Sequence, residues 1–235
     1  RCLVKDARVH GLCDLRDGDW NDGLTPEGES GGRESVMLTE QLCHGLLEVG
    51  ELAERIGDTA VAGECREWHG EFVRRLNEVA WDGEWYQRVL CDDGYVLGTH
   101  KTGEGRIFQN SQSWAILGKV APPDRATRCM DSVEKHLALD IGYRVVGPPY
   151  TRFDPKVGHS STVLPGVIEN GGCYNHAAGF KAVADCLLGR AEEAWRTYRK
   201  VAPDNPDNPI SRSNMEPFAF SNLFFADTYN YGRSL

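Results

Sequence analysis

The stretch Gly18 to Leu24 gathers two carboxylates, a tryptophan and an asparagine between two glycines. The glycines favour a loop, because a helix or a strand would send these side chains to different faces. On a loop, Trp20 offers an apolar face for the C–H surface of a sugar ring, and a carboxylate beside it can bond hydroxyls or transfer a proton. The same residues also fit an Asx turn, in which Asp and Asn bond nearby backbone and Trp20 only packs. From these residues alone both interpretations stay open.

This stretch resembles the Asp-Trp-Asn-Asp-Gly signature of the glycoside phosphorylases related to cellobiose, cellobionic acid and chitobiose phosphorylase. The run Pro165 to His176 resembles a second signature of that family, and Met215 to Phe218 resembles a third. A single tetrapeptide would be a weak match. Three matches in the family's order, spanning most of the chain, are a fairly specific one.

The resemblance implies a particular way of breaking a glycosidic bond. Inverting hydrolases pair a carboxylic acid with a carboxylate base that activates water. A phosphorylase replaces that water with phosphate, which is already anionic, so one acid and a site that holds phosphate suffice. The implied reaction is inverting phosphorolysis of a β-linked disaccharide of the cellobiose or cellobionic acid type, which gives an α-sugar 1-phosphate. The partners are the disaccharide and inorganic phosphate as co-substrate, with no cofactor and no metal.

The first signature supplies the expected proton donor. Asp22 matches the family's general acid, and Trp20 would lie beside a sugar ring. An aspartate that donates a proton near neutral pH needs a raised pKa, and burial against Trp20 is one way to raise it. Asp19 would then bond to the loop and have a structural role.

The second signature supplies the expected binding residues. His176 lies seven residues after Glu169, the spacing of the family's phosphate-binding histidine, and the helix start there favours an anion. The resemblance assigns Glu169 to hydroxyls of the acceptor sugar, and Tyr174 would add an aromatic face. A core histidine and a solvated glutamate are the plainer alternatives. Arg33 and Arg106 are further candidates for contacts with phosphate or an acidic sugar.

Composition limits the class of protein. The chain has 235 residues, 40% of them hydrophobic, with a net charge of −9, which argues against nucleic acid or an anionic membrane as a partner. No apolar run approaches the roughly 20 residues of a membrane span, and the first residues do not resemble a signal peptide. The eight cysteines include no C-x-x-C pair, so we expect reduced thiols and a cytoplasmic location, although a disulfide framework remains an alternative.

Apolar residues recur at helical spacing over much of the chain. The pattern predicts helices over 33–56 and 60–79, joined by Gly57 and an Asp58 N-cap, and further helices over 108–120, 124–139, 175–188, 191–201 and 217–229. Residues 86–97 predict a small β-hairpin, 25–32 are rich in helix breakers, and 140–171 form a long loop of the kind that lines a site.

This succession of predicted helices and loops predicts an all-α domain. The resemblance implies that the domain is an (α/α)6 toroid-type barrel, which would be incomplete here because the predicted helices are fewer than twelve. We therefore expect residues 1–235 to be part of a single catalytic domain. The family's N-terminal β-sandwich and the C-terminal end of its barrel would be absent, so the fragment alone need not be active, and the full-length protein could be a homodimer.

Two other functions fit the same residues. An inverting β-glucan hydrolase on the same barrel would need a second carboxylate as base, for which Glu169, Asp154 and Glu216 are candidates. A non-catalytic carbohydrate-binding fragment would need no catalytic carboxylate.

Overall fold

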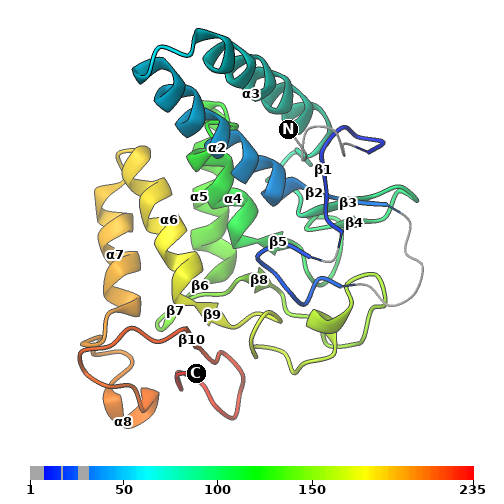
Figure 1. Cartoon of the computed structure of the whole chain (residues 1–235). Helices are drawn as coiled ribbons and strands as arrows, with labels where there is room; N and C mark the ends of the chain where they lie inside the picture. Colours follow the sequence, from blue (N-terminus) through cyan, green and yellow to red (C-terminus); the bar gives the residue numbers. More distant parts are fainter. Residues whose placement is uncertain (1–7, 17, 26–31) are drawn as a thin grey trace.

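The computed structural model describes residues 8–16, 18–25 and 32–235, so all but the two end residues of the predicted breaker segment at 25–32 lie outside the described residues. In the described part, six long helices form three hairpins beside a set of short strands (Figure 1). The hairpins are α2 (Val36–Arg55) with α3 (Thr59–Val79), α4 (Gln109–Leu117) with α5 (Pro123–Leu137), and α6 (Asn175–Leu187) with α7 (Ala191–Val201).

The first helix of each hairpin lies in one row and the second helix backs it. Helix α4 contacts both α2 and α6, whereas α3, α5 and α7 each contact the first helix of their own pair. The core between the first two hairpins is apolar, with Phe72 and Leu76 of α3 fully buried. This row of paired antiparallel helices confirms the helix-rich fold expected from the sequence.

Local signals fix the ends of the first hairpin. Ser35 caps α2, since its side chain accepts a hydrogen bond from the amide of Leu38. Helix α3 begins after the predicted cap, Asp58, whose carboxylate accepts from the amide of Val61. The prediction was wrong about the start of the first helix, because residues 33–35 pair with strand β3 instead.

The strands are more extensive than the single hairpin that the sequence predicted. In the described residues, β1 (Cys13–Asp14), β2 (Arg33–Ser35), β3 (Val89–Cys91) and β4 (Val96–Leu97) form an antiparallel sheet in that order. The predicted hairpin is its β3–β4 edge, with Leu90 opposite Val96. Three two-stranded sheets join β5 (Ile107–Phe108) to β8 (Val146–Gly147), β6 (Ala138–Leu139) to β7 (Gly142–Tyr143), and β9 (Cys173–Tyr174) to β10 (Leu223–Phe224).

Three of these strands run directly into the row of first helices. β2 precedes α2, β5 precedes α4, and β9 precedes α6, each without an intervening residue. The N-terminal ends of α2, α4 and α6 therefore open toward the strand layer, as Figure 1 shows. Because a helix N-terminus carries partial positive charge, that layer is the side of the domain suited to an anion.

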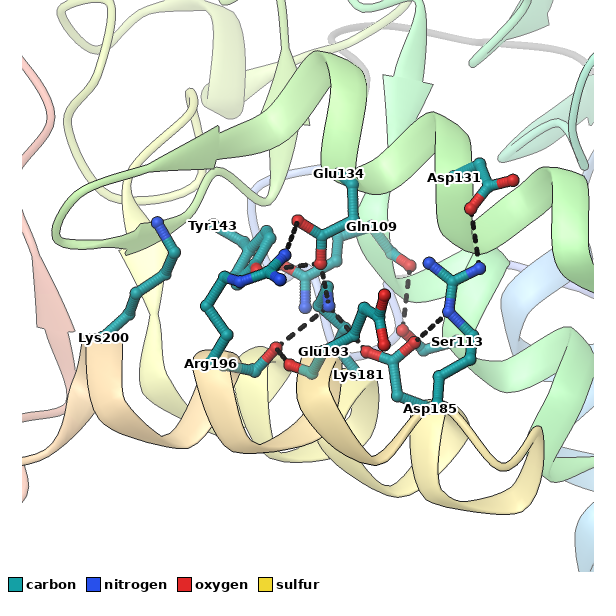
Figure 2. A network of polar contacts seen from close by, with 12 residues as sticks. Gln109, Ser113, Asp131, Glu134, Tyr143, Lys181, Asp185, Glu193, Arg196 and Lys200 are labelled. Carbon is teal, nitrogen blue, oxygen red and sulfur yellow. Dashed lines mark hydrogen bonds and ion pairs between the residues drawn. The ribbon is translucent and has the colours of Figure 1, made fainter.

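A buried ion network fixes α6 against α5 and α7 (Figure 2). The fully buried Lys181 on α6 donates to Glu134 of α5 at 2.6 Å, to Asp185 at 2.7 Å and to Thr197 of α7 at 2.9 Å. Its ammonium lies 4.3 Å from the centroid of the Tyr143 ring. A charge buried this deeply needs such partners, so the network determines how α6 sits between its neighbours.

The predicted last helix over 217–229 is wrong. That stretch holds turns and strand β10, which pairs with β9 some fifty residues earlier in the chain (Leu223 opposite Tyr174). Two short elements were not predicted, the helix α8 (Ile210–Ser213) and the 3₁₀ turn η1 (His159–Ser161) within the long loop. None of the described helices combines the length and apolar character needed to cross a bilayer.

Candidate active site

The loop of the first signature is anchored through Asp19. Its carboxylate accepts hydrogen bonds from the Ser35 hydroxyl at 2.6 Å and from the Asn21 amide at 3.0 Å, and it pairs with the guanidinium of Arg88. Arg88 also donates to the Asn21 side chain at 2.9 Å. The bond to the Asn21 amide confirms the Asx-turn interpretation for Asp19 and agrees with its expected structural role.

The ion pair of Asp19 with Arg88 is buried inside the protein. The side chains of Arg88 and Asp19 are 0% and 1% exposed. Burial by itself would raise the pKa of Asp19, but the Arg88 guanidinium and the hydroxyl of Ser35 stabilise the carboxylate and leave its pKa below the ordinary value. Arg88 enters from the turn before β3, so an ion pair between distant segments sets the loop's position.

The next residue of the loop reaches across to the second signature. The indole Nε1 of Trp20 donates to Nδ1 of His176 at 2.9 Å. An indole N–H can only donate, so Nδ1 accepts and carries no proton. His176 is therefore a neutral imidazole with its proton on Nε2, at the second residue of α6. The exposed Nε2–H is a donor at a helix N-terminus, which suits an anion.

Aromatic rings frame this contact. The Trp20 and Tyr174 rings meet edge to face with centroids 5.1 Å apart, and Phe180 lies 4.4 Å from the His176 ring, one turn along α6. Such rings provide the apolar surface that a sugar ring packs against.

Glu169 also binds the loop of the first signature, through Gly23. Its Oε2 accepts from the amide of Gly23 at 2.7 Å and from the Ser160 hydroxyl at 3.1 Å. A Cβ at position 23 would lie 2.6 Å from that carboxylate oxygen, so only glycine permits the contact. Burial raises the pKa of Glu169, the two hydrogen bonds oppose this rise, and the nearby carboxylate of Asp22 adds to it.

Asp22 lies among these groups but is exposed, so the expected burial against Trp20 is not found. Its charge acts on two neighbours, Glu169 and Tyr174. Burial, followed by the fields of Glu169 and Asp22, raises the pKa of Tyr174 to about 12, which keeps its hydroxyl neutral. The Asp22 carboxyl group thus faces solvent, near enough to Glu169 and Tyr174 for its charge to affect both.

The structure brings the five predicted site residues into one region, since Trp20 contacts Tyr174 and His176 while Asp22 acts on Glu169 and Tyr174. The two further arginine candidates differ in position. Arg33 is buried beneath the signature loop, where it donates to the Leu24 carbonyl at 2.8 Å, whereas Arg106 lines a separate cavity.

Sequence reasoning missed Arg88 and Ser160. Arg88 had a signal, because it lies in the predicted strand at 86–90, beside Val89 and Leu90, where a buried arginine needs an acid as a partner. Ser160 had none, since serines in loops are common.

Comparison with known families agrees with this geometry. Residues 3–234 match the model described as "Glycosyl hydrolase 94 superfamily, catalytic domain". A solabiose phosphorylase of Paenibacillus borealis is 40% identical over 94% of this chain and 29% of its own length. A 3-O-beta-D-glucopyranosyl-beta-D-glucuronide phosphorylase of the same organism is 38% identical over 99% of this chain and 30% of its own. A cellobionic acid phosphorylase of Neurospora crassa is 31% identical, over 94% of this chain and 28% of its own.

The chain thus spans less than a third of these curated relatives. Two solved structures share its fold at low identity. A rhamnosidase of family GH78 from Bacillus sp. GL1 matches the whole chain and 20% of its own, with a TM-score of 0.63 at 15% identity. A rhamnosidase from Klebsiella oxytoca matches 97% of this chain and 37% of its own, with a TM-score of 0.55 at 14% identity.

Proposed function

Because this chain belongs to the glycosyl hydrolase 94 superfamily, within its catalytic domain, we propose that the full-length protein cleaves a β-linked disaccharide with inorganic phosphate and inverts the anomeric centre. The relatives named for cellobionic acid and for a β-glucosyl glucuronide support a β-glucosidic substrate, and we propose one of the cellobiose or cellobionic acid type.

The observation that most supports this proposal is the hydrogen bond from Trp20 to His176. It joins two signatures 156 positions apart and orients the Nε2–H of His176 as a donor. Phosphate held there, at the N-terminus of α6, would be a nucleophile that needs no general base.

Asp22 then acts as the single general acid. Phosphate oxygen attacks the anomeric carbon from the face opposite the leaving group, so the new C–O bond forms as the glycosidic C–O bond breaks. The Asp22 carboxyl gives its proton to the departing oxygen, which leaves as the hydroxyl of the acceptor sugar.

The remaining residues hold the sugars. Trp20 and Tyr174 present ring surface, and Glu169, fixed by the Gly23 amide and the Ser160 hydroxyl, keeps a second oxygen for sugar hydroxyls. We also propose that the three hairpins are part of an (α/α)6 barrel, since the row of α2, α4 and α6 backed by α3, α5 and α7 is the arrangement of its two rings.

The test is a phosphate-dependence assay on the full-length protein with cellobiose and cellobionic acid. We expect sugar release only with phosphate, and a first product whose anomeric proton coupling identifies an α-sugar 1-phosphate. Equal release with and without phosphate would favour a hydrolase, and binding without turnover would favour a non-catalytic module.

Asp22→Asn should lower kcat by roughly 10²–10⁴ while the folded state persists, because general acid catalysis contributes that much. With an aryl β-glucoside that carries an activated leaving group, the variant should lose far less of its kcat, since the departing oxygen needs little protonation. Asp124→Asn, an exposed aspartate on α5, is the matched control and should keep full activity. A similar loss with both substrates would argue against proton donation by Asp22.

A further inference from the structure

A cavity lies on the other side of strand β5 from the candidate active site. Neighbouring residues of a strand point to opposite faces. Phe108 packs in the cluster that includes Trp20 and Tyr174, whereas Ile107 packs with Trp85 and lines this cavity. The cavity is therefore separated from His176 by the β5–β8 pair.

The cavity is small and rich in positive charge. Its volume is about 270 Å³, and its charged or titratable lining residues are Arg106, Arg144 and His136. Among the described residues that line it, none carries a carboxylate. Ligand sites for drug-sized molecules begin at about 300 Å³, so a group smaller than a disaccharide fits best.

Among the residues that the structure describes, no carboxylate pairs with Arg106 at this cavity. Its backbone is fixed, since its amide donates to Gly147 at 3.0 Å and its carbonyl accepts from the Trp85 indole at 2.9 Å. Its guanidinium lies over the Trp85 ring, 6.0 Å from the centroid. Its Nε is shielded from solvent and has no acceptor among the described residues. A buried donor of a charged group is costly to leave unpaired.

Arg144 supplies the second charge. Its guanidinium donates to the carbonyls of Gly171 and Ala226, both at 3.0 Å, which fixes its position but leaves its charge without a carboxylate. Two of its five N–H groups are used in this way, so others remain for a ligand. The described lining of this cavity thus brings together two guanidinium groups and no acid, although the chain has a net charge of −9.

We propose that this cavity binds a phosphate group between Arg106 and Arg144, either inorganic phosphate or the phosphoryl group of a sugar phosphate. Two guanidinium groups balance the charge of a phosphate near neutral pH, whereas a carboxylate would leave one of them uncompensated. His136 and the Trp85 ring close the sides of the cavity, their rings 5.4 Å apart.

The first experiment locates the anion in crystals of the full-length protein soaked in selenate, a tetrahedral oxyanion with an anomalous signal. We expect a peak between Arg106 and Arg144, which inorganic phosphate displaces. A peak at His176 would appear separately in the same map, so failure of this proposal is distinguishable from failure of the proposed function. Selenate absent from the cavity at saturating concentration would overturn the proposal.

The second experiment compares variants. Arg106→Gln removes a guanidinium that makes no hydrogen bond to the described residues, so the fold should be kept, and we expect the cavity to bind selenate about tenfold more weakly. Arg66→Gln, which removes an exposed arginine of α3, is the matched control and should bind as the wild type does. Equal occupancy in Arg106→Gln would mean an adventitious ion only and would refute the site.

Competition identifies the source of the phosphate group. Displacement of selenate by glucose 6-phosphate at lower concentration than by inorganic phosphate would assign the cavity to a sugar phosphate, and the reverse order to the free ion. Displacement by glucuronate but by neither phosphate compound would overturn the proposal, because the ligand would then be a carboxylate.

Discussion

At the scale of single residues, two neighbouring aspartates take different positions. Asp19 is buried and paired with Arg88, whereas Asp22, three residues later, faces solvent near Glu169 and Tyr174. A carboxylate locked by a guanidinium keeps a low pKa and holds no proton to give, whereas an exposed carboxyl group is accessible to a substrate. Their surroundings thus agree with an anchoring role for Asp19 and with the proton-donating role that we propose for Asp22.

Trp20 does more than provide an aromatic face, because it fixes the tautomer of His176. Trp20→Phe keeps a ring but removes the indole N–H, which frees Nδ1 to take the proton and turns Nε2 into an acceptor that repels phosphate. We expect the KM for phosphate to rise about tenfold, the value of one hydrogen bond, and the KM for the disaccharide to change less. Initial rates at varied phosphate and varied disaccharide measure both.

Trp195→Phe on α7 is the control for this change, since Trp195 is exposed and its ring stacks on Tyr198. An unchanged KM for phosphate in Trp20→Phe, or an equal rise in both KM values, would show that the hydrogen bond does not orient His176.

At the scale of elements, the position of His176 depends on how α6 is held. His176 lies on the exposed first turn, and Lys181 lies on the buried face of the same helix, where it bonds to α5 and α7. The strand β9 fixes the same end through its pairing with β10. The site residue is therefore carried by a helix that is fixed on both sides.

Lys181→Met should destabilise the protein by about 3–5 kcal/mol, because it removes the buried cation that Glu134 and Asp185 share and leaves Asp185 only its ion pair with Arg190, 3.1 Å away. Thermal or urea unfolding measures the loss. Lys135→Met, an exposed lysine of α5, is the matched control and should change stability by less than about 0.5 kcal/mol.

The double variant Lys181→Met, Asp185→Leu separates charge from packing. Since it removes both buried charges, it should recover much of the stability lost in Lys181→Met. If the double variant is as unstable as the single one, packing around Lys181 matters and the buried charge does not.

At the scale of the whole molecule, the hairpins are joined by close backbone contacts. A Cβ at Gly118, the residue that ends α4, would lie 2.5 Å from the carbonyl oxygen of Glu40 and 3.2 Å from Cβ of Cys43 on α2. Only a residue without a side chain allows α2 and α4 to approach this closely. The order of the row of helices thus depends on one small residue between the first two hairpins.

Gly118→Ala should therefore destabilise the protein by about 1–3 kcal/mol through overpacking between the hairpins. The matched control is Gly179→Ala on α6, where an added Cβ meets nothing within 4 Å and should stabilise the helix by about 0.5–1 kcal/mol. Urea unfolding of both variants gives the comparison. Equal effects would mean that the α2–α4 contact relaxes without cost.

Much of the local structure of this protein could be predicted from its sequence. The helical spacing, the Gly57 break and the Asp58 cap predicted the first hairpin closely, because helix ends depend on residues within one turn. The candidate residues of the site were named for a different reason, because the types and order of the signature residues in the chain resemble those of a known family.

Pairing between distant segments was decided only by the tertiary structure. Residues 217–229 carry enough apolar side chains for a helix, yet Leu223 pairs with Tyr174, and Arg33 to Ser35 pair with β3. The same holds for the ion pair of Asp19 with Arg88 and for the bond from Trp20 to His176. Such contacts depend on which surfaces the packed helices bring together, and no short stretch of sequence contains that information.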